Sequence, residues 1–263
     1  MLLNINMHLA YELSEATDLL LQVEVADVAD QRVLMSDIDF SDLSHLARVP
    51  AEEGLGDRIW ISADGEFRCT YKSSIQVDRP VLDLSALSAV KPHLLPWHTV
   101  RYLMPSRYCQ SDQFSSFTEA QFGHLDGGAK IDAMCAWIHS AFEYVPGSSN
   151  AQTTARDTFV QRQGICRDFA HVLITLARAS GIPARFVSVY APGVTPQDFH
   201  AVAEIYLEGT WHLVDATGMA PADTIARIGV GQDAADVAFL GVFGQARFIE
   251  QSVVVTKPES DFP

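Results

Sequence analysis

The stretch Gly164-Ile165-Cys166-Arg167-Asp168-Phe169-Ala170-His171 is the part of this sequence that best indicates its fold. Its cysteine follows a glycine and begins an apolar run. We therefore expect Cys166 at the start of a helix that ends near Ala179, before Gly181 and Pro183. The partial positive charge of a helix N-terminus favours the thiolate, which is the nucleophilic form of a cysteine. The backbone N–H of Cys166 is also a natural donor to an oxyanion at that position.

A histidine and an aspartate follow on two predicted strands downstream of this helix. If Glu208-Gly209 forms the loop of a hairpin, Leu207 pairs with Thr210. Side chains alternate along a strand, so this register makes His200 and Asp215 diagonal neighbours on one face. Diagonal positions lie about 7–8 Å apart at Cα, which lets a carboxylate reach an imidazole N–H. The sequence therefore predicts a contact between His200 and Asp215.

Two other histidines near these motifs are less well placed. His212 alternates with Asp215 and falls on the opposite face of its strand, and His171 lies about 140° around the helix from Cys166. A thiol, a histidine base and a carboxylate that orients the base form the arrangement of nucleophilic acyl transfer. We therefore predict Cys166 as nucleophile, His200 as base and Asp215 as orienting acid.

The formal net charge of −15, from 18 basic and 33 acidic residues, argues against several functions. Sequence-independent nucleic-acid binding needs clustered cations, and no basic stretch occurs. Anionic membrane surfaces repel an acidic chain, and no segment approaches the roughly 18 apolar residues of a membrane span. Residues 1–8 lack the basic start and apolar core of a signal peptide. We expect a cytoplasmic protein that binds neither nucleic acid nor membrane.

The spacing of cysteines and histidines argues against a metal site and against a disulfide framework. The four cysteines form no Cys-x-x-Cys pair, which fits free thiols in a reducing compartment. No His-Glu-x-x-His or similar ligand spacing occurs, so we expect no metal site. The cysteines other than Cys166 are expected to pack as small apolar groups, and these are Cys69, Cys109 and Cys135.

Two parts with different periodicity are visible along the chain. Up to about residue 90 the pattern is strand-like, and Asp64-Gly65 between the alternating stretches 57–63 and 66–71 predicts a hairpin. After the proline-containing segment 91–97, helices and strands are predicted over residues 130–144, 166–179, 185–190, 199–207 and 210–216. The sequence thus predicts an α+β fold, with an antiparallel β domain over residues 1–92 and a catalytic domain over residues 93–263.

Several ordered motifs surround these residues. They are residues 164–171, Pro105-Ser106-Arg107-Tyr108-Cys109, Gly181-Ile182-Pro183-Ala184-Arg185, Asp198-Phe199-His200-Ala201, Trp211-His212-Leu213-Val214-Asp215-Ala216-Thr217 and Asp233-Ala234-Ala235-Asp236-Val237. Together they resemble the bacterial transglutaminase-like cysteine peptidases, and the N-terminal β region is similar to the small leading domain of that family. The resemblance covers nearly the whole chain. It implies a papain-like transglutaminase core, the roles given above for Cys166, His200 and Asp215, and no cofactor.

One position departs from the pattern of that family, which usually has Trp two residues after the histidine. This chain has Val202 there, which leaves the shape of the acyl-binding groove open. The side chain that completes an oxyanion hole is open too, because Gln161 and Gln163 both precede the thiol closely.

We expect the thiol to form a thioester acyl-enzyme at an amide or peptide bond of a peptide or protein substrate. Hydrolysis is favoured, because water is always present and nothing in the sequence marks an amine-binding site. Two alternatives are protein-glutamine γ-glutamyltransferase activity and a non-catalytic binding protein that keeps the fold. Oligomeric state has no sequence signature.

Overall fold

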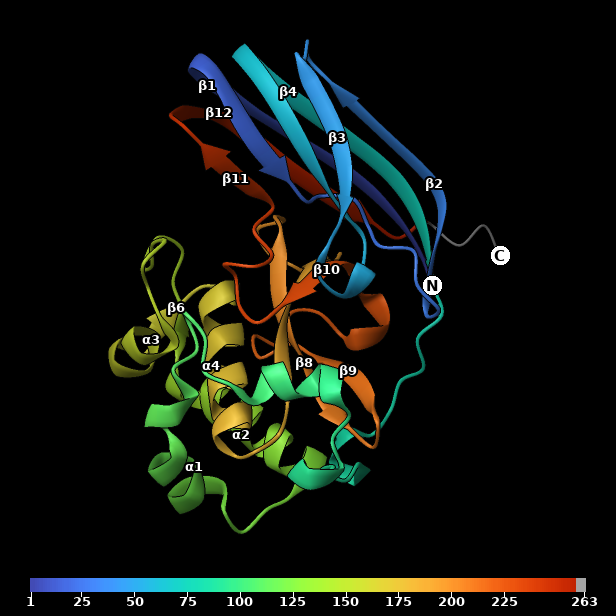
Figure 1. Ribbon diagram of the computed structural model, residues 1–263. Coiled ribbons are helices and arrows are strands. Elements are labelled where there is room, and N and C mark those ends of the chain that lie inside the picture. The colour runs from blue at the N-terminus through green and yellow to red at the C-terminus, as the bar shows by residue number, and fades with distance from the viewer. Residues whose placement is uncertain (259–263) are drawn as a thin grey trace.

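The computed structural model describes residues 1–258 and contains two antiparallel sheets with helices against the second (Figure 1). The larger sheet is built on two long strands, β1 (Leu2–Leu21) and β4 (Asp57–Val77), which pair along nearly their whole length. On the other edge of β4 lie β2 (Gln31–Phe40) and β3 (His45–Pro50). On the other edge of β1 lie β11 (Leu240–Phe243) and β12 (Ala246–Thr256).

The hairpin predicted at Asp64-Gly65 is wrong, because both flanking stretches belong to the single strand β4. The two stretches pair with one continuous partner, β1, and the register shifts between Leu13 and Thr17, opposite this dipeptide. Gly65 has φ +70° and faces open space. Its conformational freedom therefore serves an irregularity within a long strand instead of a chain reversal.

The C-terminal strands correct the expected boundary at residues 92 and 93. That boundary assigned residues 240–256 to the catalytic unit, but these residues pair with β1 in the larger sheet. Val253 and Val255 are buried in the same core as Leu3 and Ile5. The sequence pattern marks these residues as apolar, but it does not reveal which strand they will pair with, because that partner lies at the other end of the chain.

The smaller sheet has the order β10-β7-β8-β9 and is antiparallel throughout. Its strands are β7 (Ala184–Tyr190), β8 (His200–Leu207), β9 (Thr210–Val214) and β10 (Ala226–Gly231). The predicted hairpin between β8 and β9 is confirmed, since Leu207 pairs with Thr210. Both loop residues have positive φ, 49° at Glu208 and 86° at Gly209, as a two-residue hairpin requires.

Helix α4 (Cys166–Ala179) begins and ends where the sequence predicted, and its residues Ala170, Leu173 and Ala177 pack in one core with Ala203 and Ile205 of β8. The other helices are α1 (Ser115–Phe122), α2 (Gly127–Ala141) and α3 (Ala155–Gln161). The short strands β5 (Glu143–Tyr144) and β6 (Gln163–Gly164) pair in parallel. Short 3-10 helices lie at Glu52–Gly54, Leu84–Ala86, Pro92–Leu94, Trp97–Leu103, Ser111–Gln113 and Ala222–Thr224. The mixed fold confirms the predicted α+β class.

The two sheets share buried surface instead of being joined only by linkers. Tyr190, Ala226 and Ile228 of the smaller sheet belong to the hydrophobic core of the larger one. The Tyr190 hydroxyl donates to the carbonyl of Val23 at 2.8 Å. This buried contact attaches the end of β7 to the larger sheet, next to Val189, which pairs with His200 at the start of β8.

Candidate active site

The chain turns tightly immediately before Cys166. Gly164 is buried, and a Cβ at this position would lie 2.8 Å from the Cβ of Asp168, so the approach requires glycine. The Asp168 carboxylate accepts the backbone N–H of Ile165 at 2.9 Å and lies 3.1 Å from Arg167. These contacts satisfy the exposed end of α4 and hold its first residue, Cys166, in place.

His200 and Asp215 are in direct contact, as the hairpin register predicted. Nε2 of His200 lies 3.0 Å from Oδ2 of Asp215, and both side chains are almost completely buried. The same carboxylate accepts the backbone N–H and the hydroxyl of Thr217 at 2.9 and 2.7 Å, and the N–H of Ala220 at 2.9 Å. A carboxylate with this many donors has a fixed orientation, and it fixes the imidazole in turn.

These contacts determine the charge of both groups. Burial alone lowers the pKa of the His200 imidazole, but the hydrogen bond with Asp215, the interaction with the Cys166 thiol and the negative charge of both raise it to about 9. Burial alone raises the pKa of Asp215, but the hydrogen bond and charge of His200, with the bonds from Thr217, hold it below its usual range. At neutral pH the pair is therefore an imidazolium beside a carboxylate.

Cys166 and His200 line one cavity of about 370 Å³. The other nitrogen of His200, Nδ1, is buried and has no hydrogen-bond partner of normal geometry within residues 1–258. The Cys166 thiol is nonetheless close enough to raise the pKa of the ring. Asp215 lies behind the imidazole and does not line the cavity. The structure thus brings together all three residues that the sequence singled out.

Comparison with known proteins places this chain in a family. Residues 116–216, which include all three residues, match the model of the transglutaminase-like superfamily. The structure of a candidate cysteine protease from Cytophaga hutchinsonii is 32% identical, with a TM-score of 0.94 over 100% of this chain and 92% of that one. This chain belongs to the transglutaminase-like superfamily.

Two further comparisons are more distant. An uncharacterized protein of Mycobacterium leprae is 30% identical over 134 residues, and this match spans about half the length of each chain, 48% in both cases. The periplasmic domain of TgpA from Pseudomonas aeruginosa is 14% identical, with a TM-score of 0.43 over 81% of this chain and 90% of that one.

Tyr144 is a neighbour of Cys166 that the sequence did not single out. It pairs with Gly164 across β5 and β6, two residues before the thiol. Burial and the negative charge of Cys166 raise the pKa of Tyr144 to about 12, against a smaller opposite effect of the Cys166 backbone N–H. Its hydroxyl is therefore protonated at neutral pH and can donate a hydrogen bond to the sulfur. No local motif marks this tyrosine, because it reaches the site through a long-range parallel pairing.

Several residues that the sequence analysis considered do not line the cavity that holds Cys166 and His200. Gln161 is exposed at the end of α3, and Gln163 is half-buried on β6; neither lines the cavity. Val202 is fully buried in a cluster with Val187 and Leu213 and does not line the cavity.

The two other histidines also face away from the cavity. His171 stacks on Tyr108 at 5.1 Å between ring centroids, and its Nε2 accepts the N–H of Ala234. His212 lies 2.9 Å from the hydroxyl of Thr210. Neither contacts the thiol, as predicted.

The other cysteines of the transglutaminase-like chain are chemically distinct from Cys166. Burial raises the pKa of Cys69, Cys109 and Cys135 to about 12, so these thiols stay protonated. Within residues 1–258 no three His, Cys, Asp or Glu side chains form a group that could hold a metal ion. Over the same residues no helix is long and apolar enough to cross a membrane.

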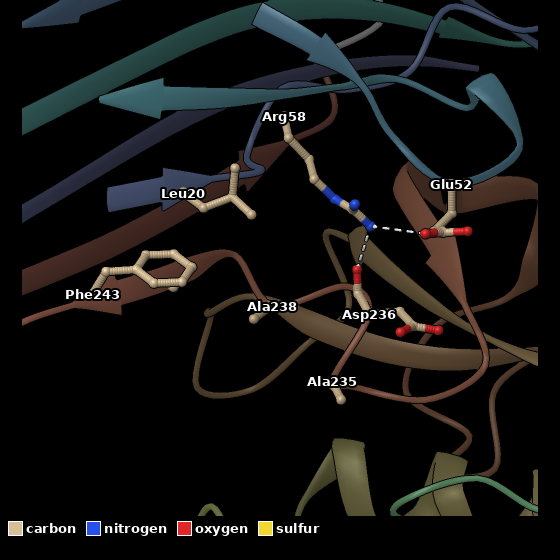
Figure 2. A pocket seen from close by; sticks show the side chains of 8 residues that line it. Leu20, Glu52, Arg58, Ala235, Asp236, Ala238 and Phe243 are labelled. Carbon is tan, nitrogen blue, oxygen red and sulfur yellow. Dashed lines mark hydrogen bonds and ion pairs between the residues drawn. The ribbon is translucent and has the colours of Figure 1, made fainter. Parts of the chain in front are cut away.

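A second pocket is lined in part by Ala235, Asp236 and Ala238 of the segment that joins β10 to β11 (Figure 2). In Figure 2 the Arg58 guanidinium extends from β4 toward Glu52 and donates to the backbone carbonyl of Asp236 at 2.7 Å. Leu20 and Phe243 form its apolar side. Among residues 1–258, the lining of this pocket includes no thiol or hydroxyl side chain, and Ala238 is the one residue that also lines the thiol cavity.

Proposed function

We propose that this transglutaminase-like protein hydrolyses amide or peptide bonds through a thioester on Cys166. The observation that supports this most directly is that the thiol and the imidazole of His200 line one cavity while Asp215 holds the other side of the ring. An enzyme of this kind needs a nucleophile, a base in reach of it and an acid that orients the base. The chain has a transglutaminase-like fold and is similar to a candidate cysteine protease. Both findings agree with this chemistry.

Acylation proceeds in two stages. The Cys166 thiolate attacks the carbonyl carbon, a C–S bond forms, and the carbonyl electron pair moves to oxygen. The backbone N–H of Cys166, at the N-terminus of α4, is the donor that we assign to the oxyanion. The C–N bond then breaks, and the departing nitrogen takes the proton that His200 carries on Nδ1. The products are a thioester and a free amine.

Deacylation reverses these roles. His200 removes a proton from water, the hydroxide attacks the thioester, and the C–S bond breaks to return the thiolate and the imidazolium. Asp215 stays ionised throughout and stabilises the positive ring. Water serves as acceptor in this proposal because it is always present at a cavity that opens to solvent. The substrate is a peptide or protein.

Removal of individual thiols tests this proposal. Cys166→Ala is expected to abolish labelling by an alkylating reagent and turnover of a mixed peptide library. The matched control, Cys135→Ala, removes a thiol whose raised pKa keeps it protonated, and it is expected to retain both. If primary amines are incorporated into glutamine peptides faster than ammonia is released, the activity is protein-glutamine γ-glutamyl transfer instead of hydrolysis. Unchanged turnover in Cys166→Ala rejects Cys166 as the nucleophile, and absence of turnover in the wild type favours a binding protein.

The cytoplasmic location expected from the sequence stays part of the proposal. Cell fractionation of the native protein, followed by immunodetection, decides it. Recovery with a cytoplasmic marker enzyme supports the location, and recovery in a periplasmic or extracellular fraction rejects it.

A further inference from the structure

We propose, on the basis of that function, that the acyl donor carries a large apolar side chain, leucine or phenylalanine, which binds against Phe199 and Phe239 beside the thiol. The two rings stack with centroids 4.5 Å apart and planes inclined by 8°. Both line the cavity that holds Cys166 and His200, and both are only partly buried. The stacked pair therefore presents an aromatic wall to whatever enters the cavity.

Other parts of the cavity wall are apolar too. Phe186 and Val237, which are both buried, line the cavity together with the small side chains of Ala201 and Ala234. A volume of about 370 Å³ is at the lower end of the roughly 300–1,000 Å³ of small-molecule sites, so the cavity has space for one large side chain and the reacting carbonyl. Transfer of an apolar side chain from water onto such a surface is favourable.

The lining also includes the polar side chains of Arg167, Ser188, Asp198 and Gln251. Gln251 of β12 donates to the Asp198 carboxylate at 2.6 Å, and this carboxylate also accepts the N–H of Phe199 at 2.7 Å. The Gln251 amide and the Asp198 carboxylate are therefore hydrogen-bonded to each other, and Asp198 is exposed to solvent. A glutamine side chain as acyl donor would place its methylene groups against the rings but would leave most of the aromatic surface uncovered.

The larger sheet fixes the position of Phe239. This residue lies between β10 of the smaller sheet and β11 of the larger one, and its carbonyl accepts the N–H of Gln22 at 2.9 Å. The ring is thus supplied by a segment that is anchored on the larger sheet. The β part of the molecule consequently contributes to substrate selection.

Turnover of acetylated aminoacyl-coumarin amides tests the preference in the wild type. We expect kcat/KM for Leu and Phe donors to exceed that for the Ala donor by roughly 10- to 200-fold, the range produced by additional buried methylene groups, and to exceed that for the Gln donor. Phe239→Ala should reduce this ratio toward unity while the rate for the Ala donor changes by only a few-fold.

The matched control is Phe243→Ala, which removes a ring that lines the second pocket and does not line the thiol cavity. It is expected to keep the wild-type ratio. Circular dichroism of each variant establishes that it is folded. If Phe239→Ala does not fold, Ala238→Leu serves instead, because it narrows the mouth of the cavity and should lower the rate for Phe donors more than for Ala donors.

Binding to Cys166→Ala protein separates this inference from the proposed function. Calorimetry with acetyl-phenylalanine amide and acetyl-alanine amide measures the cavity without any reaction. Tighter binding of the phenylalanine compound, lost in the double variant with Phe239→Ala, supports the inference even if the wild type shows no turnover. Equal binding of the two compounds, or turnover without preference for apolar donors, overturns it and leaves the proposed function intact.

Discussion

Nε2 of His200 and Oδ2 of Asp215 are 3.0 Å apart because a two-residue loop closes the hairpin between β8 and β9. Pairing of Leu207 with Thr210 brings the start of one strand beside the end of the other. The side-chain period of two then decides which residues share a face. A loop with one more residue would shift this register and separate the two groups, so the contact depends on the conformations of Glu208 and Gly209.

Asp215→Asn is expected to move the alkaline limb of the pH–rate profile to lower pH. His200 must be protonated to release the amine, and its pKa of about 9 depends on the hydrogen bond and charge of Asp215. Without the carboxylate, this pKa falls toward the unperturbed value near 6.5. The measurement is kcat/KM between pH 5 and 10. An unshifted limb in the variant would show that another group controls it.

His200 is expected to stabilise the fold in a pH-dependent way. Its pKa is raised in the folded state to about 9, so the stabilisation is fully present below the unfolded value near 6.5 and is lost as pH rises through 9. A shift of this size corresponds to about 3 kcal/mol. Urea unfolding of wild type and His200→Gln measures it. The difference between them should decrease from pH 6 to pH 9.5, and a constant difference would contradict the assignment.

Tyr144→Phe is expected to lower kcat/KM by about 10-fold or more, because a hydrogen bond to a charged group contributes roughly 1.5–3 kcal/mol. The raised pKa of Tyr144 keeps its hydroxyl protonated, so it is available to donate a hydrogen bond to the sulfur anion. The rate of Cys166 alkylation should fall as well, since this rate depends directly on the thiolate. Tyr206→Phe, on β8 of the smaller antiparallel sheet and packed against Trp211, is the control and should leave both rates unchanged. Normal alkylation in Tyr144→Phe would assign the tyrosine to packing alone.

Glu204→Gln is expected to destabilise the protein by about 3–5 kcal/mol. Its carboxylate is fully buried, 2.6 Å from Arg185 and 3.1 Å from Arg227, and removing its charge leaves two buried guanidinium groups with less compensation. Glu66→Gln breaks the exposed pair with Arg68 and should cost about 0–1 kcal/mol. Denaturant unfolding compares the two. Equal losses would mean that the buried network contributes no more than a surface pair.

Local sequence signals predicted the parts of the site that depend on local geometry. The start of α4 follows from Gly164 and the apolar run after Cys166, and the His200–Asp215 contact follows from one hairpin register. Both are decided by a few neighbouring residues. This is why three residues that are distant in sequence could be assigned to one site before their positions were known.

The missed features all depend on partners that lie far away along the chain. Asp64-Gly65 has the composition of a turn, and only the continuous strand β1 opposite it keeps β4 extended. Tyr144 and Phe239 reach the thiol through β5–β6 pairing and through attachment to the larger sheet. Alternating apolar residues reveal that a strand exists, but they do not specify which strand it pairs with.

Mass spectrometry of the acid-quenched reaction tests the central claim most directly. During turnover of a slow acyl donor, the peptide that contains Cys166 should gain the mass of the acyl group, and hydroxylamine should remove it as expected for a thioester. His200→Gln should reduce the rate at which this adduct forms. Turnover that continues with no adduct on Cys166, or with an adduct on a different residue, would contradict the account.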